Sequence, residues 1–370
     1  METVCSLNQC TGCMLCVDIC PRQAIHIEDS LDSYNALIDR KKCINCNACH
    51  NMCQNNCLVT KKPPIMSVQG WIGEDPKRER GSSGGVGSSL IEVFSNNTGS
   101  VYACYFSDGE FKFKKFSDKE NIEKFSGSKY VKSNPIGIYL KIKKELLEGR
   151  KVLFIGLPCQ VAAVKIFCKG LDNNLYTVDL ICHGTPSPQI LDSFFRDFGM
   201  TLKDVNLLRF RKKDNYHIYS NKEFNSKIPE NVMDMYTYAF LNGITFTDNC
   251  YQCQYATINR VSDMTIGDSW GSLLPKEERN KGISLILCQT EKGKELLSML
   301  NMIIYDVNLE KAVAANHQLM SPSNYPKERK CFFKYVKRGM SFDKAMRRSA
   351  PKAYYKKKLK KLLIQCKLLS

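Results

Sequence analysis

The residues best suited to chemistry in this 370-residue chain are its cysteines, and ten of the 19 lie in the first 57 positions. They form two runs with one spacing, Cys10-x2-Cys13-x2-Cys16-x3-Cys20 and Cys43-x2-Cys46-x2-Cys49-x3-Cys53, offset by 33 residues. Three thiolates at this spacing wrap one corner of an iron–sulfur cube, and the fourth cysteine turns away to ligate a second cube. The pattern therefore predicts two [4Fe–4S] clusters, one held by Cys10, Cys13, Cys16 and Cys53 and the other by Cys43, Cys46, Cys49 and Cys20.

About the first 60 residues resemble the bacterial two-cluster ferredoxins. A pair of zinc sites is the alternative, but zinc sites usually combine Cys-x2-Cys pairs across a longer loop. One detail departs from the ferredoxin pattern, because Gln54 rather than proline follows Cys53. Cys57 could therefore replace Cys53 as a ligand, and Cys5 is left as an unpaired thiol near the first cluster.

Four cysteines of the remaining chain could hold a third cluster, namely Cys159, Cys182, Cys250 and Cys253. The first two follow apolar segments that are typical of buried strands, and the last two form a Cys-x2-Cys pair. Cys159 also stands at the start of a predicted helix, a position that lowers the pKa of a thiol. The alternatives are two small core residues, Cys159 and Cys182, and a zinc or free pair at 250 and 253.

Apolar periodicity predicts alternating strands and helices in the body of the chain. The expected strands are Ser100–Phe106, Lys151–Ile155, Tyr176–Ile181, Met264–Ile266 and Ile283–Cys288. The expected helices are Ser88–Phe94, Ile138–Leu147, Gln160–Phe167, Pro188–Phe198 and Gly293–Leu300. Such alternation indicates an α/β body with a mainly parallel sheet, whose ligands bind at the carboxyl ends of the strands.

The loop Gly81-Ser-Ser-Gly-Gly-Val-Gly87 opens the first of these helices. Free N–H groups and the positive end of the helix dipole would make it an anion site, although a flexible turn fits the composition equally well. The loop is neither the dinucleotide fingerprint nor a P-loop, and no apolar strand is expected before it.

The net charge of +17 is concentrated at one end, because residues 327–370 hold 16 lysines and arginines and only two acids. The nearly neutral body argues against a nucleic-acid partner. Residues 355–369 place apolar side chains on one helical face with lysines opposite, which favours contact with an anionic membrane surface or docking on the body or a partner. Because the chain lacks a bilayer-spanning apolar run and does not open on a signal peptide, we expect a cytoplasmic protein with at most peripheral contact to the inner face of the membrane.

Six motifs occur in an order that resembles the coenzyme F420 hydrogenase/dehydrogenase beta-subunit family. They are Gly81–Val86, Gly127–Tyr130, Leu157–Gln160, Asp179–Gly184, Cys250-x2-Cys253 and Asp263–Gly271. The resemblance runs from about residue 65 to about 340, and members with an N-terminal two-cluster ferredoxin domain are common.

The resemblance implies a flavoprotein that binds FAD next to a [4Fe–4S] cluster in the body. The implied flavin contacts are Ser83, Gly84, Gly85, Ser128 and Lys129, and the implied ligands of the inner cluster are Cys159, Cys182, Cys250 and Cys253. Lys129 would stabilise the negative charge of the reduced flavin, and His183 is the candidate proton donor. The alternatives are a solvated surface lysine and a structural histidine.

We therefore expect an α+β chain with a ferredoxin-like domain at 1–62, an α/β flavin-binding body with a mainly parallel sheet at 63–340 and a basic amphipathic helical tail at 341–370. The expected function is that of an oxidoreductase that passes electrons from a partner such as reduced ferredoxin through the head clusters, the inner cluster and FAD. The acceptor would be an unidentified small-molecule or glycan-related substrate, for instance in surface polysaccharide synthesis. The alternatives are a non-catalytic electron-transfer subunit of a partner enzyme and a zinc-stabilised interaction protein.

Overall fold

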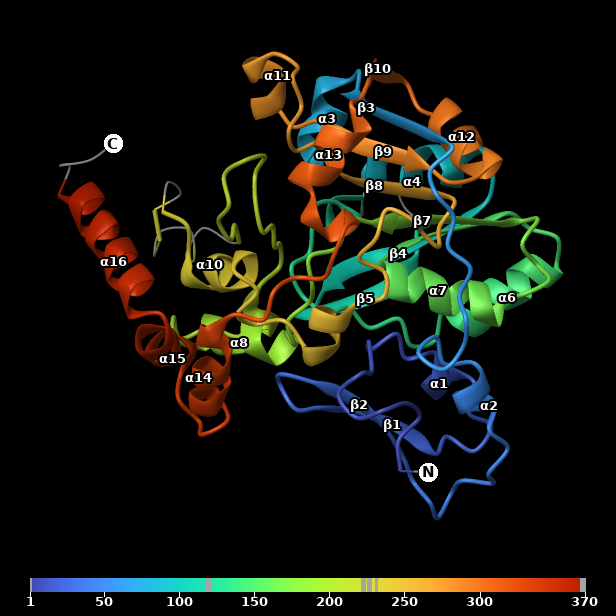
Figure 1. Ribbon diagram of the computed structural model, residues 1–370, viewed down its shortest axis with the longest axis horizontal. Helices are drawn as coiled ribbons and strands as arrows, with labels where there is room; N and C mark the ends of the chain where they lie inside the picture. The colour runs from blue at the N-terminus through green and yellow to red at the C-terminus, as the bar shows by residue number, and fades with distance from the viewer. Residues whose placement is uncertain (1, 118–121, 221–223, 225–227, 230–231, 367–370) are drawn as a thin grey trace.

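The computed structural model describes residues 2–117, 122–220, 224, 228–229 and 232–366 (Figure 1). Its N-terminal unit, the head, contains the short helices α1 (Leu15–Asp18) and α2 (Ala48–Asn51), each preceded by a left-handed residue, Met14 or Asn47. These two residues are 33 positions apart, like the cysteine runs, so the repeat in the sequence is also a repeat in the backbone. An antiparallel hairpin of β1 (Ile25–Asp29) and β2 (Tyr34–Ile38) lies between the two helices in the chain.

The body is built on one eight-stranded sheet in the order β10-β3-β9-β8-β7-β6-β4-β5. Its centre, β8-β7-β6-β4, is parallel, as strand–helix alternation predicts. β5, β9, β3 and β10 join antiparallel, so the sheet is mixed and the prediction of a mainly parallel sheet is correct only for its centre. The strands are β3 (Met66–Ile72), β4 (Ser100–Ser107), β5 (Glu110–Lys115), β6 (Val152–Gly156), β7 (Leu175–Leu180), β8 (Met264–Asp268), β9 (Ser284–Cys288) and β10 (Met302–Asp306).

The sequence patterns do not predict β3, β5 and β10, which all pair antiparallel. The hairpin of β4 and β5 turns at Asp108 and Gly109, both with positive φ, and a two-residue Asp-Gly turn is a strong hairpin signal. Phe111 and Phe113 are buried in β5 between exposed neighbours. This strand was therefore detectable from the turn and the alternation.

Helices cover both faces of the sheet. α4 (Val86–Asn97) and α12 (Glu291–Ser298) bury Leu90 and Leu296 in one core, and α6 (Tyr139–Leu147) and α7 (Pro158–Phe167) bury Ile142 and Val161 in another. α6 and α7 lie between the sheet and the head in Figure 1, and Leu15 of α1 belongs to their core. Smaller helices are α3 (Asp75–Arg80), α5 (Ile122–Phe125), α11 (Lys276–Asn280), α13 (Leu309–Ala315), η2 (Leu202–Asp204), η3 (Asp248–Gln252) and η4 (His317–Leu319).

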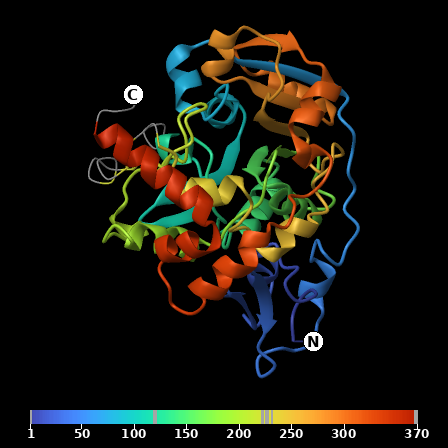
Figure 2. The same ribbon diagram turned by 60° about the vertical axis from the view of Figure 1, so that its left-hand side comes forward.

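A helical layer completes the body on one side of the sheet (Figure 2). It consists of α8 (Pro188–Arg196), α10 (Met235–Leu241), α14 (Lys327–Val336), α15 (Phe342–Ser349) and α16 (Pro351–Gln365). Phe342 and Met346 of the predicted tail are buried in its core. α16 packs Tyr354 and Ile364 against this core and leaves Leu359 and Leu362 exposed. In the described part of the chain, no helix is both long and apolar enough to span a bilayer.

Candidate metal and cofactor site

The second cysteine run surrounds a cavity at the exposed end of the head. This outer cavity measures about 310 Å³ and is lined by Cys20, Cys43, Cys46 and Cys49, the ligand set that the spacing predicts. Cys46 is exposed and the other three are half-buried. A cluster held by these residues would therefore lie at the protein surface.

The first cysteine run surrounds a buried cavity, the inner head cavity, which is lined by Cys10, Cys13, Cys16 and Cys53 together with Cys5. Cys57 lies elsewhere, and its Sγ donates a hydrogen bond to the Asn51 carbonyl at 2.8 Å. This placement favours Cys53 over Cys57 as the fourth ligand. Burial raises the pKa of Cys13 and Cys16, so these thiols would lose their protons on binding iron.

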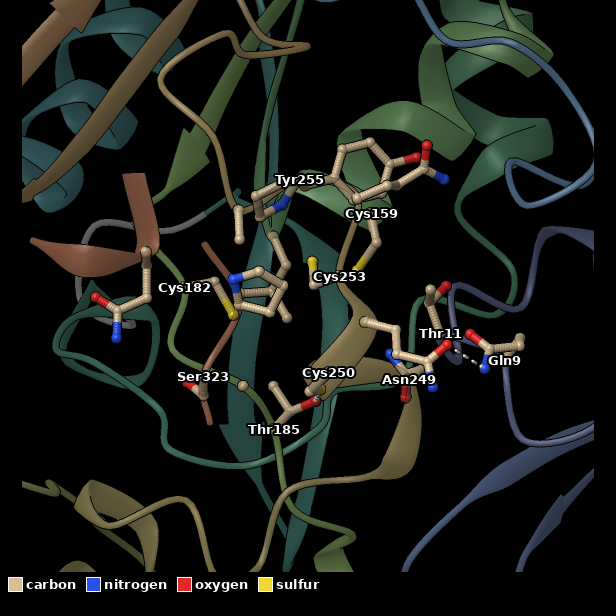
Figure 3. Close-up of a pocket in the computed structure, with 18 of the residues that line it drawn as sticks. Gln9, Thr11, Cys159, Cys182, Thr185, Asn249, Cys250, Cys253, Tyr255 and Ser323 are labelled. Carbon is tan, nitrogen blue, oxygen red and sulfur yellow. Dashed lines mark hydrogen bonds between the residues drawn. The ribbon is translucent and has the colours of Figure 1, made fainter. Parts of the chain in front are cut away.

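The four cysteines of the body meet around a third cavity of about 310 Å³, the inner cavity (Figure 3). Cys159 is the second residue of α7, Cys182 follows the carboxyl end of β7, and Cys250 and Cys253 lie in and after η3. Parallel strands place these ends at one edge of the sheet, so residues far apart in sequence converge there. Thr11 and Gln9 of the head line the same cavity.

The pKa of Cys159, one of the thiols of the inner cavity, differs from the sequence prediction. The prediction that the helix start lowers the pKa of Cys159 is wrong, because burial raises that pKa well above its ordinary value. Burial also raises the pKa of Cys182 to about 12. Thr247 Oγ1 lies 3.6 Å from the Cys250 sulfur and Thr185 Oγ1 lies 3.9 Å from it, so hydroxyl groups surround this ligand.

The donor set of the inner cavity suits a cluster better than a single ion. Among the described residues, no three His, Cys, Asp or Glu side chains lie close enough together to hold one metal ion. A zinc ion would draw its thiolates to about 2.3 Å from one point, whereas a four-iron cube holds them apart around itself. Four cysteines around a cavity of about 310 Å³ fit the second arrangement.

A buried ion pair joins the segments that carry the inner cysteines. Arg260 Nη2 donates to Asp179 Oδ1 at 3.0 Å, and Arg260 Nη1 donates to the Tyr255 carbonyl at 2.7 Å. Burial raises the pKa of Asp179, and Arg260 opposes that rise. The pair ties the end of β7, which leads to Cys182, to the segment that follows Cys253.

Replacing Arg260 with methionine is expected to destabilise the fold by about 3–5 kcal/mol, because Asp179 would remain buried without its cation. The measurement is the urea midpoint of the full chain. Arg196→Met breaks the exposed pair with Asp192 and serves as the control, with an expected loss of about 0.5 kcal/mol or less. Equal midpoints for the two variants would contradict this role of Arg260.

A fourth cavity of about 250 Å³, the loop cavity, lies between the loop 81–87 and the carboxyl ends of β6, β7 and β8. α4 begins at Val86 within this loop, and Val86, Gly87 and Ser88 of its first turn line the cavity. Ser83 Oγ donates to the Ile283 carbonyl at 2.6 Å, and Gly84 N donates to Ser284 Oγ at 3.0 Å. The loop is thus fixed to β9 and is not a flexible turn. No apolar strand was expected before the loop, but β3 precedes it in the chain.

Four of the five residues implied as flavin contacts line the loop cavity: Ser83, Gly85, Ser128 and Lys129. The fifth, Gly84, belongs to the same loop but does not line the cavity, and an added Cβ there would be 2.5 Å from the Gly70 carbonyl oxygen. Lys129 Nζ donates to the carbonyls of Phe125 and Ser126 at 2.8 and 3.2 Å. Burial lowers the pKa of Lys129, which is therefore not a solvated surface lysine.

Sequence reasoning did not identify Arg211 and Tyr216, which also line the loop cavity. Arg211 is buried, and it donates to Asp268 Oδ1 at 2.5 Å and to the Tyr216 hydroxyl at 2.9 Å. Asp268 belongs to one of the six motifs, but nothing in the spacing connects it with Arg211. Only the fold brings these segments together.

The inner cavity and the loop cavity share a wall formed by Leu157 and residues 182–185. His183 lies in this wall, with its Nδ1 2.8 Å from Gln318 Nε2. Because an amide nitrogen donates, Nδ1 accepts, and the ring proton is on Nε2. Burial lowers the pKa of His183 to about 4, so the ring is neutral at pH 7.

Comparison with known proteins gives matches to two families. Residues 149–308 match the family described as the C-terminal part of the beta subunit of coenzyme F420 hydrogenase/dehydrogenase, and residues 6–26 match a 4Fe-4S binding domain. The resemblance expected from the sequence is confirmed over residues 149–308. The match to the beta subunits contains all four cysteines of the inner cavity, and the chain is an iron–sulfur electron-transfer protein related to these subunits.

Among solved structures, a chain of the F420-reducing [NiFe] hydrogenase complex from Methanosarcina barkeri is similar at 16% identity with a TM-score of 0.47. The alignment covers 70% of this chain and 91% of that chain. No curated protein matches the sequence.

Proposed function

We propose that the chain is an iron–sulfur flavoprotein oxidoreductase that carries electrons between the exposed face of its head and the loop cavity of its body. The observation that carries this proposal is the wall shared by the inner cavity and the loop cavity. Groups bound in these two cavities would be neighbours. Clusters supply single-electron transfer, and FAD would combine single electrons into two-electron reductions.

The arrangement of the cavities supports a serial order. The outer cavity is at the surface and the inner head cavity is buried next to the body. Tyr139 OH donates to the Cys13 carbonyl at 2.5 Å, and Tyr255 OH donates to Gln54 Oε1, so both hydroxyls tie the inner head cavity to the body. Tyr255 also lines the inner cavity. Electrons would enter at the outer cavity and leave at the loop cavity.

The residues of the loop cavity have separate roles in this proposal. The free N–H groups of the loop 81–87 bind the anionic part of FAD. Lys129 is half-buried at the cavity, where its cation would favour negative charge on the bound ring. His183 carries its proton on Nε2 in the wall and is the candidate hydrogen-bond donor to a small-molecule or glycan-related substrate.

The full chain, reconstituted anaerobically with iron, sulfide and FAD, tests this function by absorbance. Reduced ferredoxin added in stoichiometric amounts should bleach the flavin, and a dye acceptor should then sustain turnover. Clusters that become reduced while bound flavin stays oxidised would contradict the proposal. Reduction of an organic substrate would separate an enzyme from a subunit that only hands electrons to a partner.

The face around the outer cavity suits an acidic one-electron carrier such as a ferredoxin. Arg22 and Arg40 line the outer cavity and are exposed, Lys41 and Lys42 are exposed just before Cys43, and Ile44 is 58% exposed beside Cys43. Glu2 pairs with Arg40 and reduces the local charge, but the two lysines are free of ion pairs among the described residues. A basic rim around an apolar centre steers an acidic partner and lets it dock.

Charge reversal at this rim is expected to slow reduction by an acidic ferredoxin. The double variant K41E/K42E should lower the second-order rate constant about tenfold at low ionic strength, and the difference should shrink in high salt. Stopped-flow absorbance measures the rate, with dithionite as a small reductant that both proteins accept equally. K276E/R279E reverses two exposed charges on α11, at the opposite end of the molecule in Figure 1, and should leave the rate unchanged. Equal rates for the two double variants would contradict docking at this face.

The cytoplasmic location and the membrane contact stay predictions. α16 presents Leu359 and Leu362 to solvent beside its lysines, which supports contact with an anionic surface. The other face of α16 contacts the body, since Tyr354 OH donates a hydrogen bond to Asp343 at 2.8 Å. Docking on the body therefore accounts for part of the apolar stripe.

A further inference from the structure

Lys132 is a buried lysine at the junction of the head and the body, and no sequence motif identifies it. Its side chain is 4% exposed, and its Nζ donates to the Thr11 carbonyl at 3.0 Å. Thr11 lies between Cys10 and Cys13, so this hydrogen bond reaches the backbone of the first cysteine run. Lys132 also lines the inner cavity with Cys159 and Cys182.

The surrounding chain is shaped to hold Lys132 in this place. Its backbone N–H donates to the Pro186 carbonyl at 2.9 Å, which fixes it beside the shared wall. Its stem passes over Gly12, where an added Cβ would lie 2.9 Å from Lys132 Cδ. Its Nζ lies 5.0 Å from the centre of the Tyr34 ring. Gly12 therefore leaves the room that the lysine occupies.

Among the described residues, the charge of Lys132 has no partner of opposite sign. Within the described part of the chain, no carboxylate forms an ion pair with it, and its side-chain hydrogen bond goes to a neutral carbonyl. Buried charges in proteins are normally paired. A four-iron cube with four thiolate ligands carries net negative charge, and the cysteines next to Lys132 are the sets expected to hold two such cubes.

We propose that Lys132 is the shared counter-ion of the inner-head cluster and the inner cluster, and that it raises the reduction potential of both. The inference rests on the proposed function only in requiring clusters at these two sites. Adding an electron makes a cluster more negative, and a fixed cation nearby stabilises the reduced form. The outer cluster, at the far side of the head, would not feel this charge. Lys132 acts through the clusters and is a positioning and tuning residue.

The test is the potential of each cluster in the full chain with Lys132→Met, measured by potentiometric titration followed by electron paramagnetic resonance. At a fixed potential, the ratio of reduced to oxidised inner cluster should fall about tenfold, which for a one-electron couple is about 59 mV. The inner-head cluster should shift in the same direction and the outer cluster should stay unchanged. Lys132→Arg keeps the charge and should restore both potentials.

Lys165→Met is the matched control, because Lys165 Nζ also donates to one backbone carbonyl, that of Val261 at 2.9 Å, but lines none of the four cavities. Unchanged potentials in Lys132→Met with full iron content would overturn the inference. If Lys132→Met binds less iron, retention of the iron by Lys132→Arg supports a charge effect, and equal loss in both variants contradicts it. The iron content of the unmodified chain tests the proposed function separately.

Discussion

Cys182→Ser is expected to remove the inner cluster and to disconnect the head from the flavin. Among the described cysteines, Cys182 alone lines both the inner cavity and the loop cavity. Serine is a poor ligand for iron, so iron should fall from about twelve to about eight atoms per chain. Reduction of the flavin by ferredoxin should slow by more than about 100-fold, while the head clusters still accept electrons.

Iron analysis and stopped-flow absorbance measure the two effects. Cys168→Ser is the control, because Cys168 is a fully buried cysteine near the end of α7 that lines none of the four cavities. It makes the same chemical change and should keep all the iron and the rate. A Cys182→Ser protein that retains about twelve irons would remove Cys182 from the ligand set.

The second large effect is expected at the loop that opens α4. Gly84→Ala places a Cβ 2.5 Å from the Gly70 carbonyl oxygen and 3.0 Å from Ser284 N, and neither backbone atom can retreat without moving a strand. Overpacking of this kind costs about 1–3 kcal/mol, and displacement of the loop should lower FAD affinity about tenfold or more. The iron content should not change, since the cysteines lie elsewhere.

Flavin retained after desalting, together with a fluorescence titration of FAD, measures the effect. Gly73→Ala is the control. Gly73 follows the end of β3, the strand that contains Gly70, and an added Cβ there would be 3.8 Å from its nearest neighbour, the Asn301 carbonyl oxygen. This control should bind FAD normally. Normal FAD binding by Gly84→Ala would contradict the assignment of the loop as the flavin site.

The cysteine sets and most elements of the body were predictable, because they depend on the spacing of residues that are close in the sequence. Apart from Cys5, the cysteines that line the two head cavities are those of the two equally spaced runs, and every strand and helix predicted in the body is present within a few residues. Spacing alone could not say that Cys53 lines the inner head cavity while Cys57 bonds to Asn51, because that choice depends on the turn after α2.

Long-range partners were not predictable. Arg260 meets Asp179, and Lys132 meets Thr11, only because the sheet and the docked head bring distant segments together. β3 and β10 pair antiparallel at one edge of the sheet, and their short runs carry no turn signal comparable to that of β5. The state of Cys159 was also missed, because burial outweighs the effect of the helix start.

The most direct test of the whole account is a count of iron, acid-labile sulfide and flavin per chain after anaerobic reconstitution of the full protein. Three cavities lined by cysteines and one loop cavity predict about twelve iron atoms, about twelve sulfides and about one FAD. The visible absorbance should bleach with dithionite. Eight irons or fewer, or a chain that retains no flavin under any condition, would contradict the account.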